Sequence, residues 1–414
     1  MKRAALLVFA AAIAHADVAQ LPPPTLPTLS ERLANGLTVI VQEDDSVSSV
    51  VVHVRYDGGI ADEDEAHAGY SHLVEKLFFL GSVHVKAGEV EQRIDAAGGF
   101  ASSTTDADRV SLYEQVPAGG LELALWLEAE RMAGLADGIT DAGLAAARDA
   151  IAAEVRAAYE DEPYALVDRE VSRALWPERV DPLVVPTPTR DSVRAYVRER
   201  FVPANATIAI VGHVDAARTL SLAQTYFGWI PGGARRVVQA TTVEPLHQMV
   251  RRTVAAPDPK IVVAYRLNKL DAEDALAVAV GARMIERAGG GHDADVQVEL
   301  VRSGQGGELR ITARPRPGED LIKDTSPITV IADRLGSTDP PSDQVRAAAA
   351  SLDRDFLVAL EGLTYRADAL AAGLPIDLRR GELRMISPEQ IKRSAAYWLA
   401  KTASVTIIGI PEKR

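Results

Sequence analysis

His72, Glu75 and Lys76 are the residues of this sequence whose types and spacing best suit catalytic chemistry. Apolar residues recur around them at helical spacing, which predicts a helix over 66–80. Positions i, i+3 and i+4 share one helix face, so an imidazole, a carboxylate and an amine would project together. Such a face can bind a metal ion and accept a proton. An ordinary solvated helix face also carries this pattern, so the three residues alone do not define a site.

The segment from His72 to Lys76 differs at one position from H-x-x-E-H, the inverted zincin signature. In that signature both histidines bind zinc and the glutamate activates the metal-bound water. Lys76 stands where the second histidine would be.

A longer stretch around this motif carries a family resemblance. Residues 69–82, GYSHLVEKLFFLGS, are similar to the signature segment of the pitrilysin/insulinase zinc peptidases. The similarity covers about residues 30–232 and is thinner over 245–414, where mainly the layout matches. It continues in the family's order through residues 98–99, 104–109, 113–117, 121–132, 148–164, 203–207 and 226–231.

The resemblance implies a role for several positions. His72 takes the place of the first zinc ligand, Glu75 that of the general base, and Glu154 that of the distant third ligand. Ser102 and Ser103 take the place of the Asn-Ala pair that family members usually carry on the strand that binds a peptide substrate.

The resemblance also implies a substrate contact in the second half of the chain. Active members carry an arginine and a tyrosine seven residues apart that bind the substrate carbonyl. Arg302 offers the arginine, but the residue seven positions later is Leu309. An ordinary surface arginine is the alternative interpretation of Arg302.

Lys76 makes zinc binding doubtful, because a catalytic zinc takes three protein ligands and one open position. An ammonium group has no lone pair and would have to lose its proton before it could bind a metal. We expect Lys76 to lie between Glu75 and Glu154 and to supply the positive charge that zinc would otherwise provide. Zinc, the family's cofactor, is therefore expected to be absent or weakly bound.

The N-terminus has the three parts of a secretory signal peptide. A basic start at residues 1–3 precedes a short apolar run at 4–14, and Ala14-His15-Ala16 is a cleavage pattern. A disordered tail or a first helix is the alternative. The pattern predicts a periplasmic or secreted protein, and no later stretch is long and apolar enough to cross a bilayer.

Composition excludes several other functions. The chain has no cysteine, so neither disulfides nor cysteine-ligated metals are available. A formal net charge of −13 leaves no basic surface for nucleic acid.

A chain of 414 residues predicts two domains, and a glycine- and proline-containing polar stretch near 228–245 marks the boundary between them. The resemblance implies an α+β fold with two similar domains, each a mixed β-sheet with helices packed on one face. The predicted divisions are a signal peptide, a proline-rich lead-in, an N-terminal peptidase-like domain and a C-terminal peptidase-like domain, at 1–16, 17–29, 30–230 and 245–414.

Periodicity predicts the main elements, and the same order of helix, strand and glycine ends both halves. Asn35-Gly36 is a turn signal that opens into a strand. The predicted strands are 37–42, 49–56, 207–211, 260–265 and 405–408. The further predicted helices are 121–132, 141–159, 190–201, one from 271, one long helix over 343–372 and one from 387.

Three functional hypotheses follow. The first is an exported, non-catalytic zinc-metallopeptidase homologue that forms a heterodimer with an active pitrilysin-type subunit to enclose peptide substrates. The second is an active zinc endopeptidase that uses His72, Glu154 and water or deprotonated Lys76 as ligands. The third is a peptide-binding scaffold without a protease partner.

Overall fold

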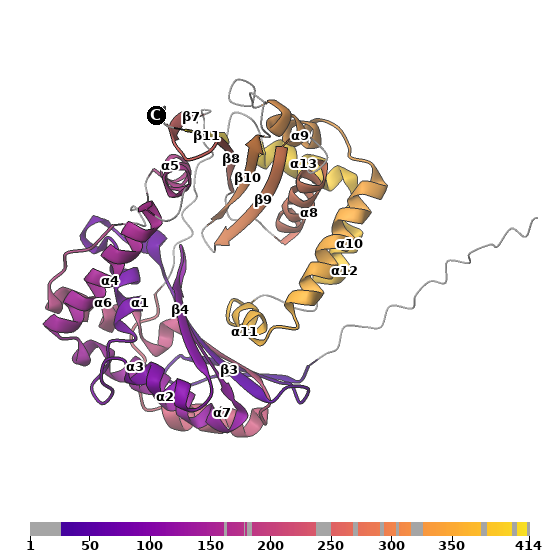
Figure 1. Cartoon of the computed structure of the whole chain (residues 1–414). Helices are drawn as coiled ribbons and strands as arrows, with labels where there is room; N and C mark the ends of the chain where they lie inside the picture. The colour runs from indigo at the N-terminus through magenta and orange to yellow at the C-terminus, as the bar shows by residue number, and fades with distance from the viewer. Residues whose placement is uncertain are drawn as a thin grey trace, which may run out of the picture.

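A computed structural model shows two β-sheets with helices around them (Figure 1). The predicted signal peptide and most of the lead-in lie outside the residues that the structure describes. Those residues are 26–160, 164–177, 179, 184–236, 250–267, 272–289, 294–303, 306–315, 326–373, 379–399 and 404–411.

The first sheet is formed by the first half of the chain. Strands β2 and β6 run parallel, and every other neighbouring pair in this sheet is antiparallel. Gly36, at a φ of 91°, lies in the turn that joins the first two strands, as the Asn-Gly signal predicts. The strand order is β1 (Thr28–Arg32), β2 (Thr38–Glu43), β6 (Ala206–Gly212), β3 (Ser49–Asp57), β5 (Arg109–Pro117) and β4 (Phe100–Thr105).

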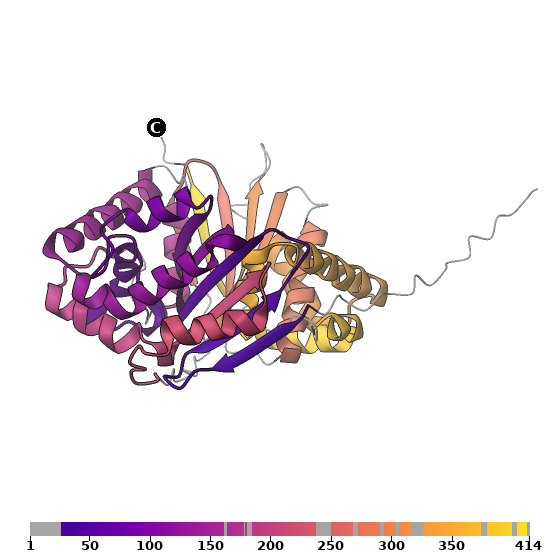
Figure 2. The same ribbon diagram turned by 90° about the horizontal axis from the view of Figure 1, so that it is seen from below.

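Helices of the first half gather on one side of this sheet, as the view from below also shows (Figure 2). Helix α5 differs from the others, because it packs on the second sheet. These helices are α1 (Tyr70–Leu77), α2 (Glu89–Ala96), α3 (Leu121–Gly138), α4 (Asp141–Glu160), α5 (Ala165–Leu175), α6 (Arg190–Arg200) and α7 (Ala216–Phe227).

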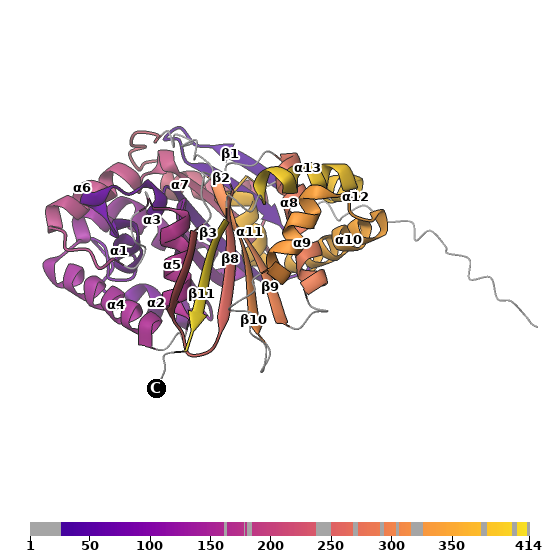
Figure 3. The same ribbon diagram turned by 90° about the horizontal axis from the view of Figure 1, so that it is seen from above.

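The second sheet repeats the plan of the first, with one parallel pair, β7 and β11. Figure 3 shows its strands side by side in the order β7 (Val250–Ala255), β11 (Ser404–Ile410), β8 (Lys260–Leu267), β10 (Gly306–Pro315) and β9 (Ala294–Ser303). The helices of this half are α8 (Ala272–Gly289), α9 (Ser326–Ser337), α10 (Ser342–Ala359), α11 (Leu363–Ala371), α12 (Arg379–Met385) and α13 (Pro388–Trp398). The predicted α+β class with two mixed sheets is confirmed.

The central strands of each sheet are buried on both faces, and the period of two along a strand shows how. In β3, Val50, Val52 and Val54 face the helices of the first half, whereas Val51 faces α11 from the second half. In β8, likewise, alternate residues face the second-half helices and α5 from the first half. Each half therefore covers one face of the other half's sheet with a single helix.

Two details differ from the expectations. The predicted helix 343–372 is two helices, α10 and α11, because the chain breaks at Glu361 and Gly362, and glycine is a poor helix former. Strand β1 begins at Thr28, within the predicted lead-in 17–29, and its residues Thr28 and Leu29 pair with β2. Among the described helices, none combines the length and the apolar character that a membrane span needs.

Candidate functional site

Helix α1 carries the motif and is fixed at its N-terminus by a carboxylate. Glu63 accepts backbone hydrogen bonds from Gly69 (2.7 Å) and Ser71 (2.6 Å), which satisfies amides that the helix leaves unpaired. Burial raises the pKa of Glu63. Gly69 has a φ of 77°, and a Cβ there would lie 2.9 Å from Val184, so glycine is needed for this entry into the helix.

The apolar side of α1 packs into the core of the first half, where Leu73, Val74 and Leu77 are almost fully buried. His72 and Lys76 lie on the opposite side and are each 21% exposed. Glu75, between them in sequence, is only 8% exposed at its side chain.

The structure joins four predicted site residues in one network. His72 Nε2 lies 3.0 Å from Glu154 Oε2 on α4. Lys76 Nζ lies 2.7 Å from Glu154 Oε1 and 3.5 Å from Glu75 Oε1. The ammonium thus lies between the two carboxylates.

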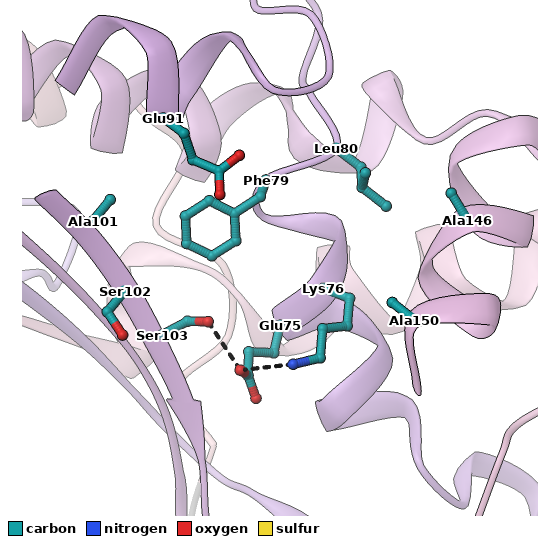
Figure 4. Close-up of a pocket in the computed structure, with 10 residues that line it drawn as sticks. All are labelled: Glu75, Lys76, Phe79, Leu80, Glu91, Ala101, Ser102, Ser103, Ala146 and Ala150. Carbon is teal, nitrogen blue, oxygen red and sulfur yellow. Dashed lines mark hydrogen bonds and ion pairs between the residues drawn. The ribbon is translucent and has the colours of Figure 1, made fainter. Parts of the chain in front are cut away.

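Strand β4 completes the network from the edge of the first sheet. Ser103 Oγ donates a hydrogen bond of 2.9 Å to Glu75 Oε1 (Figure 4). Ser102, the predicted substrate contact, is exposed at the preceding position of the same strand. Among the described strands β4 pairs only with β5, so its other edge has no strand partner in that part of the chain.

Glu75, Lys76, Ser102 and Ser103 line a cavity of about 330 Å³. Figure 4 shows that the side chains come from α1 and the turn after it, from α2, from β4 and from α4. Carboxylates and an ammonium share the wall with small and aromatic apolar groups, a mixture that suits a peptide better than a small apolar ligand. The lining residues are Glu75, Lys76, Phe79, Leu80, Glu91, Ala101, Ser102, Ser103, Ala146 and Ala150.

A buried charge cluster supports the C-terminal end of α1. Arg131 Nε donates to the Phe78 carbonyl (3.3 Å), and the guanidinium pairs with Glu114 (3.2 Å) and Glu128. Burial and the neighbouring Glu128 carboxylate raise the pKa of Glu114 well above its usual range, although Arg131 opposes this effect. The cluster fixes the turn that leads from the motif helix into the cavity wall.

The remaining predicted site residue, Arg302, lies in the second sheet. Its backbone pairs with Gly307 in β10, and its side chain lies outside the described residues. Leu309, in the position of the expected tyrosine, is fully buried in the second core. Leu309 therefore faces the second core.

Sequence reasoning missed three site features. It did not find the capping role of Glu63, the place of Glu91 in the cavity wall, or the hydrogen bond from Ser103 to Glu75. An acidic residue a few positions before a helix start is a signal for Glu63. Nothing in the local sequence indicates the other two, since both depend on how separate elements pack.

The signature implies a bound zinc ion, and the side chains at this site show whether they could hold one. His72 and Glu154 are suitable ligands, but Lys76 presents an ammonium that already donates to Glu154. Throughout the described part of the chain, no three His, Cys, Asp or Glu side chains are arranged to hold a metal ion. The residues present do not fit the three-ligand zinc site of the signature.

Comparisons with known proteins point to one family. The family model described as insulinase (peptidase family M16) matches residues 38–183. A second model, described as the peptidase M16 inactive domain, matches residues 188–304 and so does not include the motif at His72. Together they match well over half of the chain.

Relatives and solved structures agree with this assignment. An uncharacterized zinc protease of Mycobacterium leprae is 27% identical over 247 residues, which is 58% of this chain and 52% of that protein. The chain thus spans about half the length of this relative. A Helicobacter pylori protease has the same fold, with a TM-score of 0.83, 17% identity and coverage of 94% of this chain and 100% of that one.

The periplasmic protease PqqL of Escherichia coli has a TM-score of 0.74 and 13% identity, and the match covers 93% of this chain but 48% of PqqL. Both family models, which match consecutive segments, and the relatives named zinc proteases indicate the same family. The chain belongs to the pitrilysin/insulinase family of peptidases, M16.

Proposed function

We propose that this chain is a non-catalytic M16 homologue that helps to enclose peptides without holding a catalytic zinc. The observation that carries the proposal is the Lys76 ammonium, 2.7 Å from Glu154 and 3.5 Å from Glu75. A group that donates hydrogen bonds to the remaining carboxylates cannot at the same time serve as the third ligand.

Partnering with a second, active M16 chain is the next part of the proposal. The match to PqqL covers 93% of this chain but 48% of PqqL, so PqqL carries a second portion of about the same length beyond the matched part. A heterodimer would supply the second portion from a separate chain. The cavity beside the outer edge of β4 is the surface on which a peptide would lie.

The basic start, apolar run and cleavage pattern of residues 1–16 support export, so we place this function in the periplasm or outside the cell. The predicted boundaries of the two peptidase-like domains, 30–230 and 245–414, belong to the same proposal.

Metal analysis of the purified mature chain, alone and with a candidate M16 partner, tests the proposal. We expect less than stoichiometric zinc in the chain alone and peptide cleavage only in the presence of the partner. Glu75→Gln in this chain should not abolish cleavage by the pair, because the partner would supply the catalytic site. Stoichiometric zinc, with chelator-sensitive cleavage that Glu75→Gln abolishes, would establish an active zinc endopeptidase instead. Peptide binding without any M16 partner would favour a scaffold.

A further inference from the structure

The Lys76–Glu75 pair lies where three elements meet. Both residues belong to α1, Glu154 to α4, and Ser103 to the edge strand β4. Lys76 contacts Glu154, and Glu75 accepts the hydrogen bond from Ser103. The three elements form most of the cavity wall, as Figure 4 shows.

Burial decides which of these links matters most. Glu154 is 49% exposed, and ion pairs to exposed carboxylates contribute little to stability. The Glu75 side chain is 8% exposed, and a buried carboxylate without a cation is costly. Ser103 gives Glu75 a neutral hydrogen bond, whereas Lys76 gives it positive charge. The ammonium therefore matters most for Glu75 and, through Ser103, for the position of β4.

We propose that the Lys76 ammonium is a built-in cation that holds α1, α4 and β4 together, so that the cavity keeps its shape without a metal ion. Lys76 is thus a positioning residue that replaces the structural part of the zinc ion's role. This inference rests on the proposed function, because it takes the site to be free of metal. It follows that a chelator leaves the arrangement of the cavity wall unchanged.

Hydrogen–deuterium exchange of the full mature chain in EDTA tests the role of Lys76. We expect Lys76→Met to speed amide exchange in β4 by roughly tenfold, since it removes a charged partner of Glu75. Exchange in the contacting turns of α4 should rise by less, because Glu154 is 49% exposed. Lys392→Met is the matched control. Lys392 Nζ lies 2.7 Å from Asp339 Oδ1 on the surface of the second half and is 35% exposed. The control should leave exchange in β4 and α4 unchanged.

Lys76→His gives a second measurement in case the methionine variant does not fold. This variant restores the signature, so its β4 and α4 should exchange quickly in EDTA and slowly with added zinc chloride. Unchanged exchange in Lys76→Met, or no slowing by zinc in Lys76→His, overturns the role of Lys76. Stoichiometric zinc in the wild-type chain would instead contradict the proposed function, so the two failures are distinguishable.

Discussion

At the scale of single residues, Arg131 supplies positive charge to two buried carboxylates. Its side chain is 3% exposed, and those of Glu114 and Glu128 are 1% and 0% exposed. Glu114 Oε2 and Glu128 Oε2 have no hydrogen-bond partner among the described residues. The cluster therefore depends on one guanidinium, which also holds the end of the motif helix through the Phe78 carbonyl.

Arg131→Met should lower the free energy of unfolding by about 3–5 kcal/mol, the usual cost of breaking a buried pair on one side. Urea denaturation monitored by circular dichroism measures the change. Arg393→Met removes an exposed pair with Glu273 and should cost about 1 kcal/mol or less. Equal losses in the two variants would show that the cluster is not buried as described.

The structure brings together four residues that the sequence singles out, but the sequence does not predict all of their contacts. His72, Glu75 and Lys76 follow from helical spacing, and Glu154 from the family's ligand spacing. The bond from Ser103 to Glu75 depends on the register of β4 against β5. Residues 102–105 of β4 are serine and threonine, so no apolar alternation indicates beforehand which side chain faces α1.

At the scale of elements, the contact of α11 with the first sheet combines apolar packing with titratable groups. Leu363, Ala367 and Ala371 pack on Val51 and its neighbours in β6. Arg366 pairs with Asp44 at one end of this contact.

His53 is fully buried beneath α11, and neither of its ring nitrogens forms a hydrogen bond among the described residues. Its ring stacks on Tyr113 at 4.3 Å. Burial lowers the pKa of His53 to about 4, while Asp368 on α11 opposes this shift and Arg109 and Arg55 add to it. His53 is thus neutral in the folded chain at neutral pH.

Asp106 has the opposite shift in the same region. Burial raises its pKa to about 6, with Arg109 opposing the shift and Asp108 adding to it. Below its unfolded value of 6.5, His53 binds a proton only in the unfolded chain, so its effect lowers stability as the pH falls towards 4. Between its usual pKa of 3.8 and about 6, Asp106 binds a proton preferentially in the folded chain. Its effect therefore raises the stability of the fold as the pH falls through that range.

Single substitutions should separate these two effects. His53→Leu leaves the effect of Asp106, so this variant should gain stability relative to the wild type as the pH falls from 6 to 4. Asp106→Asn leaves the effect of His53, so it should lose stability over the same range. The change in unfolding free energy relative to the wild type should be larger for His53→Leu than for Asp106→Asn, because the Asp106 side chain is 40% exposed. Unfolding free energies measured at pH 4, 5, 6 and 7 test the signs, and parallel profiles would contradict both assignments.

The sequence predicts much of the element order, but it does not predict that α5 and α11 each pack on the sheet of the other half. The valine-rich run of β3 shows that both faces of the strand are buried, yet a strand buried on both faces does not reveal which helix covers it. The end of each half, a helix followed by a strand and a glycine, is predictable because it needs only local periodicity. Which sheet α11 covers depends on contacts more than 300 residues apart, such as Arg366 with Gln42.

At the scale of the whole molecule, α5 and α11 connect the two sheets, because each packs on the sheet formed by the other half. Helix α5 places Val167, Val171 and Leu175 on the second sheet. Polar contacts accompany this packing: Lys260 Nζ lies 3.2 Å from Asp168, and Trp176 Nε1 donates to Glu308 at 3.2 Å. Separation of the halves would expose both apolar contacts at once, so the chain should unfold as a single cooperative unit.

A protease site inserted between residues 237 and 249 tests this coupling. After cleavage in native buffer, we expect the two fragments to elute together on size exclusion, because α5 and α11 still cover the opposite sheets. Val171→Asp buries a carboxylate in the α5 contact and should release the fragments after cleavage. Leu166→Asp, on the same helix but 42% exposed, is the control that should keep them together. Separation of the wild-type fragments without denaturant would mean that α5 and α11 contribute little, and that each half folds independently of the other.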